Sequence, residues 1–110
     1  MNKRLLLITL ILITATPAAA TMLVNSASKY CLDTDGVAAN GGNVRMWRCV
    51  KHPNQGWRVI ERSGIYSFRN NASSFCLDTD GARANGAQVR IWGCVNHPNQ
   101  LWEMIKLPTG

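Results

Sequence analysis

The chain has 110 residues, a formal net charge of +6 and four cysteines. This length indicates one small domain. The 12 lysines and arginines are scattered along the sequence rather than gathered in a run, which excludes a nucleic-acid footprint. Four cysteines in so short a chain are typical of an exported, disulfide-stabilised protein. The basic surface is expected to attract acidic glycans or membranes weakly.

The first twenty residues have the layout of a secretory signal peptide. Lys3 and Arg4 give a positive start, an uncharged run covers residues 5–16, and small alanines end the segment. We therefore expect cleavage after Ala20 and a mature chain over residues 21–110, secreted to an extracellular or periplasmic space. The apolar run is short for a membrane span and no second one follows, so membrane insertion is not expected.

The remaining sequence predicts short β-strands and no helix. Glycine, asparagine, aspartate and proline interrupt it every few residues, and no stretch keeps a helical period. Strands are expected over residues 22–24, 30–33, 44–47, 57–60, 65–69, 75–78, 89–92 and 102–106. The predicted class is therefore all-β.

Alternation along these strands assigns faces to their side chains. The inward set is expected to be Val44, Met46, Val89 and Ile91, and the outward set Arg45, Trp47, Arg90 and Trp92. In the same way Trp57 with Val59, and Trp102 with Met104, are expected in the core. Each half of the chain therefore has one tryptophan for packing and one that a ligand could meet.

The two halves of this strand pattern are copies of one another. Residues Asn25–Ile60 and Asn70–Ile105 are identical at 23 of 36 aligned positions, with an offset of 45 residues. Such a period indicates one supersecondary unit used twice. We expect repeat one over residues 22–64 and repeat two over residues 65–110.

The equal spacing of the cysteines favours one of the three possible pairings. Cys31–Cys49 and Cys76–Cys94 each span 18 residues, and each bridge would contribute about 3 kcal/mol of stability through loop entropy.

The alternative is a zinc site at Cys49-x-x-His52 and its copy, which oxidised cysteines could not form. An Asp-x-Asp-Gly stretch at Asp33 lacks the other ligands of a calcium loop. No metal or cofactor is expected.

The order C-L-D, then W-x-C, then N-Q-x-W, occurs twice and resembles the ricin B-type lectin repeat. This unit occurs in carbohydrate-binding modules of secreted hydrolases and in cell-binding subunits of some bacterial toxins. The resemblance implies a β-trefoil, which has three repeats of four strands about a pseudo-threefold axis. It also implies that the Q-x-W residues Trp57 and Trp102 lie in the core. Two repeats predict an incomplete trefoil.

The resemblance also implies one sugar site in each repeat. The aspartate of C-L-D would accept hydrogen bonds from sugar hydroxyls, the tryptophan before the second cysteine would stack on the sugar, and the Asn-Gln pair would complete the polar contacts. An arginine stands where some family sites carry glutamine, and it would favour an acidic or multiply hydroxylated glycan. The predicted carbohydrate-binding residues are Asp33, Arg45, Trp47, Asn54 and Gln55, and Asp78, Arg90, Trp92, Asn99 and Gln100. In the alternative reading these polar residues only satisfy turns.

We therefore expect a secreted carbohydrate-binding protein. The alternative is a non-catalytic accessory or cell-binding subunit of a secreted toxin or hydrolase complex that acts mainly through protein contacts. Catalysis is not expected, because no nucleophile and base stand at a recognisable spacing. Since a trefoil closes with three units, self-association or a partner subunit is expected to cover the open faces of two.

Overall fold

The computed structural model describes residues 20–106 and residue 108, so the expected signal peptide lies outside the described residues, apart from its last residue. The described chain is all-β, as predicted. Its strands are β1 (Cys31–Asp33), β2 (Gly42–Asn43), β3 (Arg45–Trp47), β4 (Trp57–Arg62), β5 (Ile65–Asn70), β6 (Cys76–Asp78), β7 (Arg90–Trp92) and β8 (Trp102–Glu103). Two 3₁₀ turns, η1 (Pro53–Gln55) and η2 (Pro98–Gln100), precede β4 and β8. No helix in this described part has the length and hydropathy needed to cross a membrane.

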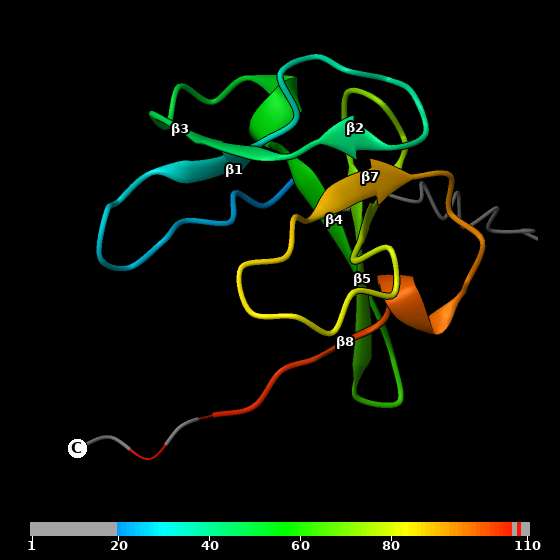
Figure 1. The fold of residues 1–110 in the computed structure, drawn as a ribbon. Helices are drawn as coiled ribbons and strands as arrows, with labels where there is room; N and C mark the ends of the chain where they lie inside the picture. The colour runs from blue at the N-terminus through cyan, green and yellow to red at the C-terminus, as the bar shows by residue number, and fades with distance from the viewer. Residues whose placement is uncertain (1–19, 107, 109–110) are drawn as a thin grey trace, which may run out of the picture.

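The strands form two antiparallel sheets, and the larger one contains strands from both repeats (Figure 1). In the smaller sheet β1 pairs with β3, and in the larger the order is β2-β7-β6-β5-β4, with β8 on β5. The hairpin of β4 and β5 connects the repeats and pairs six residues of each strand. The short strand β2 crosses from repeat one to pair with β7, so repeat one covers part of repeat two.

The core lies where the two repeats meet. Trp57 and Ile91 are fully buried, and Leu77, which is 5% exposed, belongs to the same cluster. The indole Nε1 of Trp57 donates a hydrogen bond to the carbonyl of Leu32 at 3.1 Å, so the buried polar edge of the ring is satisfied. Trp102, its copy, is only half-buried and contacts the ring of Phe68.

Both predicted disulfides are present. Cys31 is bonded to Cys49, and Cys76 is bonded to Cys94. Each bridge connects the start of a C-L-D strand to the segment after the outward tryptophan. The alternative zinc site is excluded, because the sulfurs that would ligate the metal are bonded to each other.

Two of the predicted core side chains are exposed instead. Met46 is 42% exposed and Met104 is 66% exposed, whereas Ile91, the copy of Met46, is 0% exposed. The difference has one physical reason: β2 pairs with β7 at Ile91, so Gly42 lies close to the isoleucine side chain, whereas β3 at Met46 pairs with β1 alone among the described strands. The strand predicted over residues 102–106 ends at Glu103, and the one over residues 22–24 is reduced to isolated bridges at Thr21 and Val24.

Candidate functional site

The carboxylate of Asp33 is the buried anchor of the site in repeat one. It ends β1 and is only 3% exposed. Its Oδ1 accepts hydrogen bonds from the backbone N of Asp35 at 2.6 Å and from Nε of Arg45 at 3.2 Å. Its Oδ2 accepts one from Nε2 of Gln55 at 3.0 Å. Three donors therefore fix this carboxylate and satisfy its charge.

The guanidinium of Arg45 is held between two carboxylates and an aromatic ring. Nη1 of Arg45 lies 3.0 Å from Oδ1 of Asp35, in addition to the contact of Nε with Asp33. Its Cζ lies 4.0 Å from the centre of the Trp47 ring. This distance is typical of a cation–π contact. Arg45 and Trp47 stand two positions apart on β3, so their side chains leave the strand on the same face. The arginine thus covers part of the expected sugar platform.

Gln55 lies beneath the site rather than on its surface. It is fully buried, and its Nε2 donates to the carbonyl of Arg48 at 2.7 Å as well as to Asp33. Its Oε1 accepts a hydrogen bond from the backbone N of Val50 at 2.9 Å. The side chain therefore has no free group for a ligand, and it ties the loop after β3 to Asp33. The turn η1 places it there, with His52 Nδ1 accepting from Asn54 N at the start of the turn.

Asn54 borders the turn that Asp35 and Gly36 form. A Cβ on Gly36 would lie 3.6 Å from the side-chain nitrogen of Asn54, so the amide faces this turn. Its backbone carbonyl accepts from Asn70 Nδ2 at 3.0 Å, while its side chain makes no hydrogen bond to another described residue. The amide is therefore available to a ligand. Gly36 has φ +72°, a conformation that favours glycine and keeps the turn tight.

Repeat two reproduces this geometry closely. Asp78 Oδ1 accepts from Arg90 Nε at 3.0 Å, Asp80 Oδ1 lies 3.0 Å from Arg90 Nη1, and Asp78 Oδ2 accepts from Gln100 Nε2 at 3.1 Å. The guanidinium lies 4.2 Å from the centre of the Trp92 ring. Asn99 faces the Gly81 turn as Asn54 faces Gly36.

The carboxyl of Asp78 has a pKa below its ordinary value of 3.8. Burial is the largest single influence and raises this pKa, because it disfavours the charged form. The hydrogen bonds from the backbone of Asp80 and from Arg90 and Gln100, together with the charge of Arg90, lower the pKa and outweigh burial. The carboxylate is therefore held ionised at neutral pH.

The two tryptophan platforms differ in their surroundings. Trp47 is 48% exposed, whereas Trp92 is half-buried. The loop before β2 in repeat one explains this: a Cβ on Gly41 would lie 3.9 Å from Cζ3 of Trp92. In the same loop Oδ1 of Asn40 accepts a hydrogen bond from the backbone N of Gly93 at 2.7 Å. Repeat one therefore forms one wall of the site in repeat two.

The structure brings together all the predicted residues of each repeat, but in two layers. Asp33 and Gln55 lie below, and Arg45, Trp47 and Asn54 lie toward the surface. The sequence reasoning missed the second aspartates, Asp35 and Asp80, whose carboxylates are exposed and bind the arginines. The signal is the Asp-x-Asp-Gly stretch in both copies, which predicts a turn but does not reveal that its second aspartate meets an arginine of another strand.

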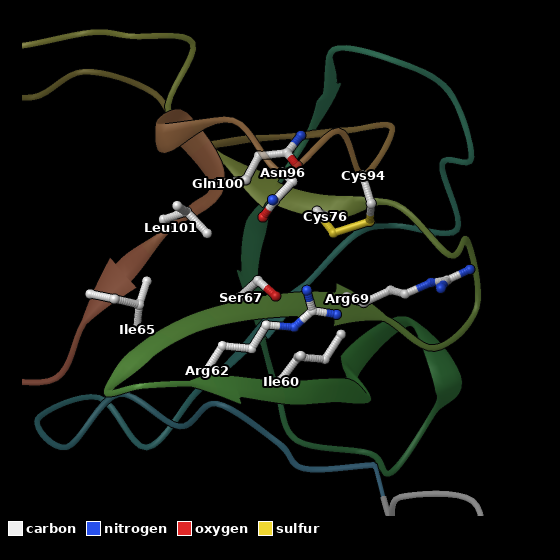
Figure 2. Close-up of a pocket in the computed structure, with 10 residues that line it drawn as sticks. All are labelled: Ile60, Arg62, Ile65, Ser67, Arg69, Cys76, Cys94, Asn96, Gln100 and Leu101. Atoms are coloured by element: carbon white, nitrogen blue, oxygen red, sulfur yellow. A yellow bond between two sulfur atoms is a disulfide. The ribbon is translucent and has the colours of Figure 1, made fainter.

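A groove lies away from the tryptophans of these sites (Figure 2). It has a volume of about 460 Å³ and runs between the β4–β5 hairpin and the Cys76–Cys94 bridge. Arg62 and Arg69 stand on the hairpin side, and Gln100 contributes to the opposite wall. Among the described residues no group of three or more histidines, cysteines, aspartates or glutamates is arranged to hold a metal ion.

The sequence pattern of the family described as the ricin-type β-trefoil lectin domain matches residues 19–109. The chain belongs to this family. No curated protein sequence matches the chain.

Solved structures with the same fold include a designed three-fold symmetric protein, ThreeFoil, with a TM-score of 0.77 and 25% identity over 84% of this chain and 68% of that one. An exo-β-1,3-galactanase from Clostridium thermocellum has a TM-score of 0.76 and 20% identity over 84% of this chain and 21% of that one. The hemolytic lectin CEL-III has a TM-score of 0.63 and 30% identity over 77% of this chain and 20% of that one. The chain thus spans about two thirds of the designed protein and about a fifth of the two natural ones.

Proposed function

We propose that the chain is a secreted carbohydrate-binding module with one shallow site in each repeat. The observation that carries this proposal is the guanidinium–indole stack, which recurs in both repeats. In each repeat an equivalent pair of aspartates binds the arginine. Sugars present hydroxyls at fixed angles and a C–H face, so an aromatic surface bordered by fixed polar groups is a suitable receptor. Membership of a lectin-domain family supports the same function.

Each residue has a role in this proposal. Trp47 and Trp92 offer the indole surface on which a sugar ring stacks. Asp35 in repeat one, with the free N–H groups of Arg45 and the amide of Asn54, forms the polar border. Below them, Asp33 binds the arginine and Gln55 binds Asp33. Asp78 and Gln100 have the same positions in repeat two. These four residues position the arginines and do not reach the ligand. This divides the predicted set into contacting and positioning residues.

The arginines favour glycans that carry anionic groups or many hydroxyls. A sugar that stacks on Trp47 meets a guanidinium whose Nε and Nη1 are already engaged by aspartates, while its remaining donors are free. A guanidinium presents these donors in a fixed planar arrangement that matches a carboxylate or a sulfate. The net charge acts in the same direction: the full sequence carries +6, and removal of the expected signal peptide with Lys3 and Arg4 leaves 6 − 2 = +4.

We propose that the module acts by binding and not by catalysis. In each repeat both aspartates bind the same arginine, so the pair does not flank an open space of the kind in which a glycosidic bond is cleaved. The galactanase shares the fold with this chain over only 21% of its own length.

A glycan array with neutral and acidic glycans, probed with the chain expressed through its own export signal, tests the proposal. We expect binding in the millimolar range for each site, with an increase when two sites meet a multivalent surface. The matched control is Arg58→Ala, which removes an exposed arginine outside the stacks. Absence of binding to every glycan would favour the second candidate, a non-catalytic accessory or cell-binding subunit. The supporting observation is the exposure of large apolar side chains, among them Val95, Met104 and Ile105.

A further inference from the structure

The two repeats differ in chemistry around the disulfide that lies beside each outward tryptophan. The predicted carbohydrate-binding residues are the same in both copies, so the differences between the copies lie elsewhere. Four differing positions stand within two residues of a bridge cysteine: repeat one carries Lys29, Tyr30, Arg48 and Lys51, where repeat two carries Ser74, Phe75, Gly93 and Asn96. Each exchange removes a positive charge or a hydroxyl group from repeat two. The two sites therefore share their sugar contacts but not their neighbours.

A hollow in the surface of repeat one lies at this place. It is lined by Tyr30, Trp47, Arg48 and Val50 and has a volume of about 340 Å³, which suits a small ligand. Tyr30, Trp47 and Val50 are 47%, 48% and 53% exposed, so the lining is open to solvent. Trp47 is also the platform of the proposed sugar site. The hollow therefore continues from that platform rather than forming a separate cavity.

The fold holds the two segments of this hollow together. Cys31 pairs with Trp47 in the ladder of β1 and β3, and Tyr30 directly precedes and Arg48 directly follows this pair. The Cys31–Cys49 bridge connects the same two segments covalently. In addition, Sγ of Cys49 lies 3.5 Å from the carbonyl oxygen of Lys29. The ladder and the bridge thus fix the lining before any ligand arrives.

The border of the hollow is positively charged. Lys29, Arg48 and Lys51 are all exposed. Every ion pair among the described residues joins Arg45 or Arg90 to an aspartate, so none of the three cations has a carboxylate partner there. Like charges near one bridge repel one another, and a bound anion would offset this repulsion. The border therefore favours a ligand with a negative charge.

The equivalent place in repeat two is neutral and is partly filled by the chain itself. Phe75 has no hydroxyl group and packs against the buried cluster. The backbone N of Gly93 donates to Oδ1 of Asn40 at 2.7 Å, and a Cβ on Gly93 would lie 3.4 Å from the same oxygen. A side chain at this position would therefore crowd the loop of repeat one.

We propose that the hollow is a subsite of repeat one alone, which takes the anionic group of a glycan whose neighbouring sugar stacks on Trp47. The ligand class is a glycan that carries sulfate or carboxylate groups. The inference rests on the proposed carbohydrate binding and adds a difference between the two sites. Both sites stack a sugar, but only repeat one has a place for an acidic group on the next sugar.

Each residue of the hollow has its own role in this subsite. The guanidinium of Arg48 presents paired donors in the geometry of a sulfate or a carboxylate. Lys29 adds a point charge beside it. Tyr30 offers an aromatic surface with a hydroxyl group at its edge, and Val50 forms an apolar wall. Arg45 has two of its nitrogens engaged by aspartates, so Arg48 is the more available guanidinium.

The test first separates the two sites. Trp92→Ala leaves the site of repeat one, and Trp47→Ala leaves that of repeat two. Both variants are probed on an array that carries each sulfated or uronic glycan beside its neutral parent. We expect the preference for the acidic member of a pair to be about fivefold larger in Trp92→Ala, because exposed charge pairs are individually weak but several cations act together. This excess should disappear as the ionic strength rises from about 0.05 M to about 0.5 M.

Substitutions taken from the other copy then identify the residues responsible. In the variant that keeps only the site of repeat one, Lys29→Ser installs the residue of repeat two, and Lys29 and Ser74 share a positive φ of 62° and 65°. Arg48→Gln removes the charge without adding backbone freedom. Together they should abolish the excess preference for acidic glycans. Arg83→Ala is the matched control, because it removes an exposed cation outside the hollow and installs the residue that repeat one carries as Ala38.

The outcomes distinguish this inference from the proposed function. Absence of glycan binding by the wild type would overturn carbohydrate binding itself, and the subsite with it. If both sites bind glycans and prefer acidic ones equally, the sugar sites stand and the subsite alone is overturned. It is also overturned if Arg83→Ala lowers the preference as much as Arg48→Gln does, since net charge would then be the cause. The larger loss, for the sulfated or for the uronic glycans, identifies the anionic group that the hollow takes.

Discussion

The guanidinium of Arg45 lies 4.0 Å above the ring of Trp47, and this contact defines the surface that repeat one presents. Without the arginine the indole would be an open platform, as the sequence motif predicts. With it, the ring is stacked with a guanidinium that two aspartates hold in place. The exposed side of the stack combines an apolar ring with hydrogen-bond donors, which is the combination that a sugar ring with an anionic substituent requires.

The double variant Trp47→Ala with Trp92→Ala is expected to remain folded and to lose glycan binding. Both side chains lie outside the buried cluster of Trp57, Leu77 and Ile91, so their removal opens no core cavity. Circular dichroism and the glycan array give the two readouts. The control is Trp57→Ala, which truncates a fully buried ring and is expected to reduce the free energy of unfolding by about 3–5 kcal/mol. Unfolding of the double variant would show that the platforms are structural.

The variants Arg45→Gln and Arg90→Gln are expected to change the glycan preference. Glutamine removes the charge over the indole and restores the residue type that some family sites carry. Binding to acidic glycans should decrease at least tenfold, while binding to neutral glycans is retained or increased. Arg58→Ala changes the net charge equally without touching a stack, so it isolates the local effect. If Arg58→Ala lowered binding to acidic glycans as much as the stack variants do, the preference would depend on net charge alone.

The sequence predicted the fold class, both disulfides and the buried Trp57 because these depend on repetition and alternation. It was wrong about Met46 and Met104, because alternation assigns a side chain to a face but does not reveal whether another segment of the chain packs beside it. Only the pairing of β2 with β7 explains why Ile91 is buried and Met46 is not.

The layering of the site could not be predicted either. The motif places Asp33, Asn54 and Gln55 in one site. It does not reveal that the side chain of Gln55 is buried while that of Asn54, the residue before it, is partly exposed. The role of Asp35 depends on the reach of Arg45 from another strand, which a one-dimensional spacing does not specify.

The variant Gln55→Ala is expected to destabilise repeat one. The glutamine satisfies Val50 N and the carbonyl of Arg48, and it donates to Asp33. Leaving buried polar groups without partners costs about 1–3 kcal/mol each, so we expect a reduction of about 2–4 kcal/mol in the free energy of unfolding. Urea denaturation measures it, with Gln88→Ala at an exposed position as the control. A change below about 0.5 kcal/mol would contradict the positioning role.

The stability of the fold is expected to decrease in acid through Asp78. The pKa of this carboxyl in the folded chain lies below its ordinary value of 3.8. The folded state therefore binds the proton less readily than the unfolded state, so the stabilising contribution is complete above about pH 4 and is lost as the pH falls through the folded pKa. Physically, protonation removes the charge that Arg90 and the two hydrogen-bonded neighbours hold.

Comparison with Asp78→Asn isolates this contribution, because asparagine keeps the size of the side chain and cannot titrate. Thermal midpoints measured from pH 7 to pH 2 should show the wild type more stable than the variant above pH 4, with the difference shrinking as the pH falls below about 4. A difference that stays constant down to pH 2 would mean that the charge of Asp78 contributes nothing to folding. The variant's loss would then come from its altered hydrogen bonds to Arg90 and Gln100 alone.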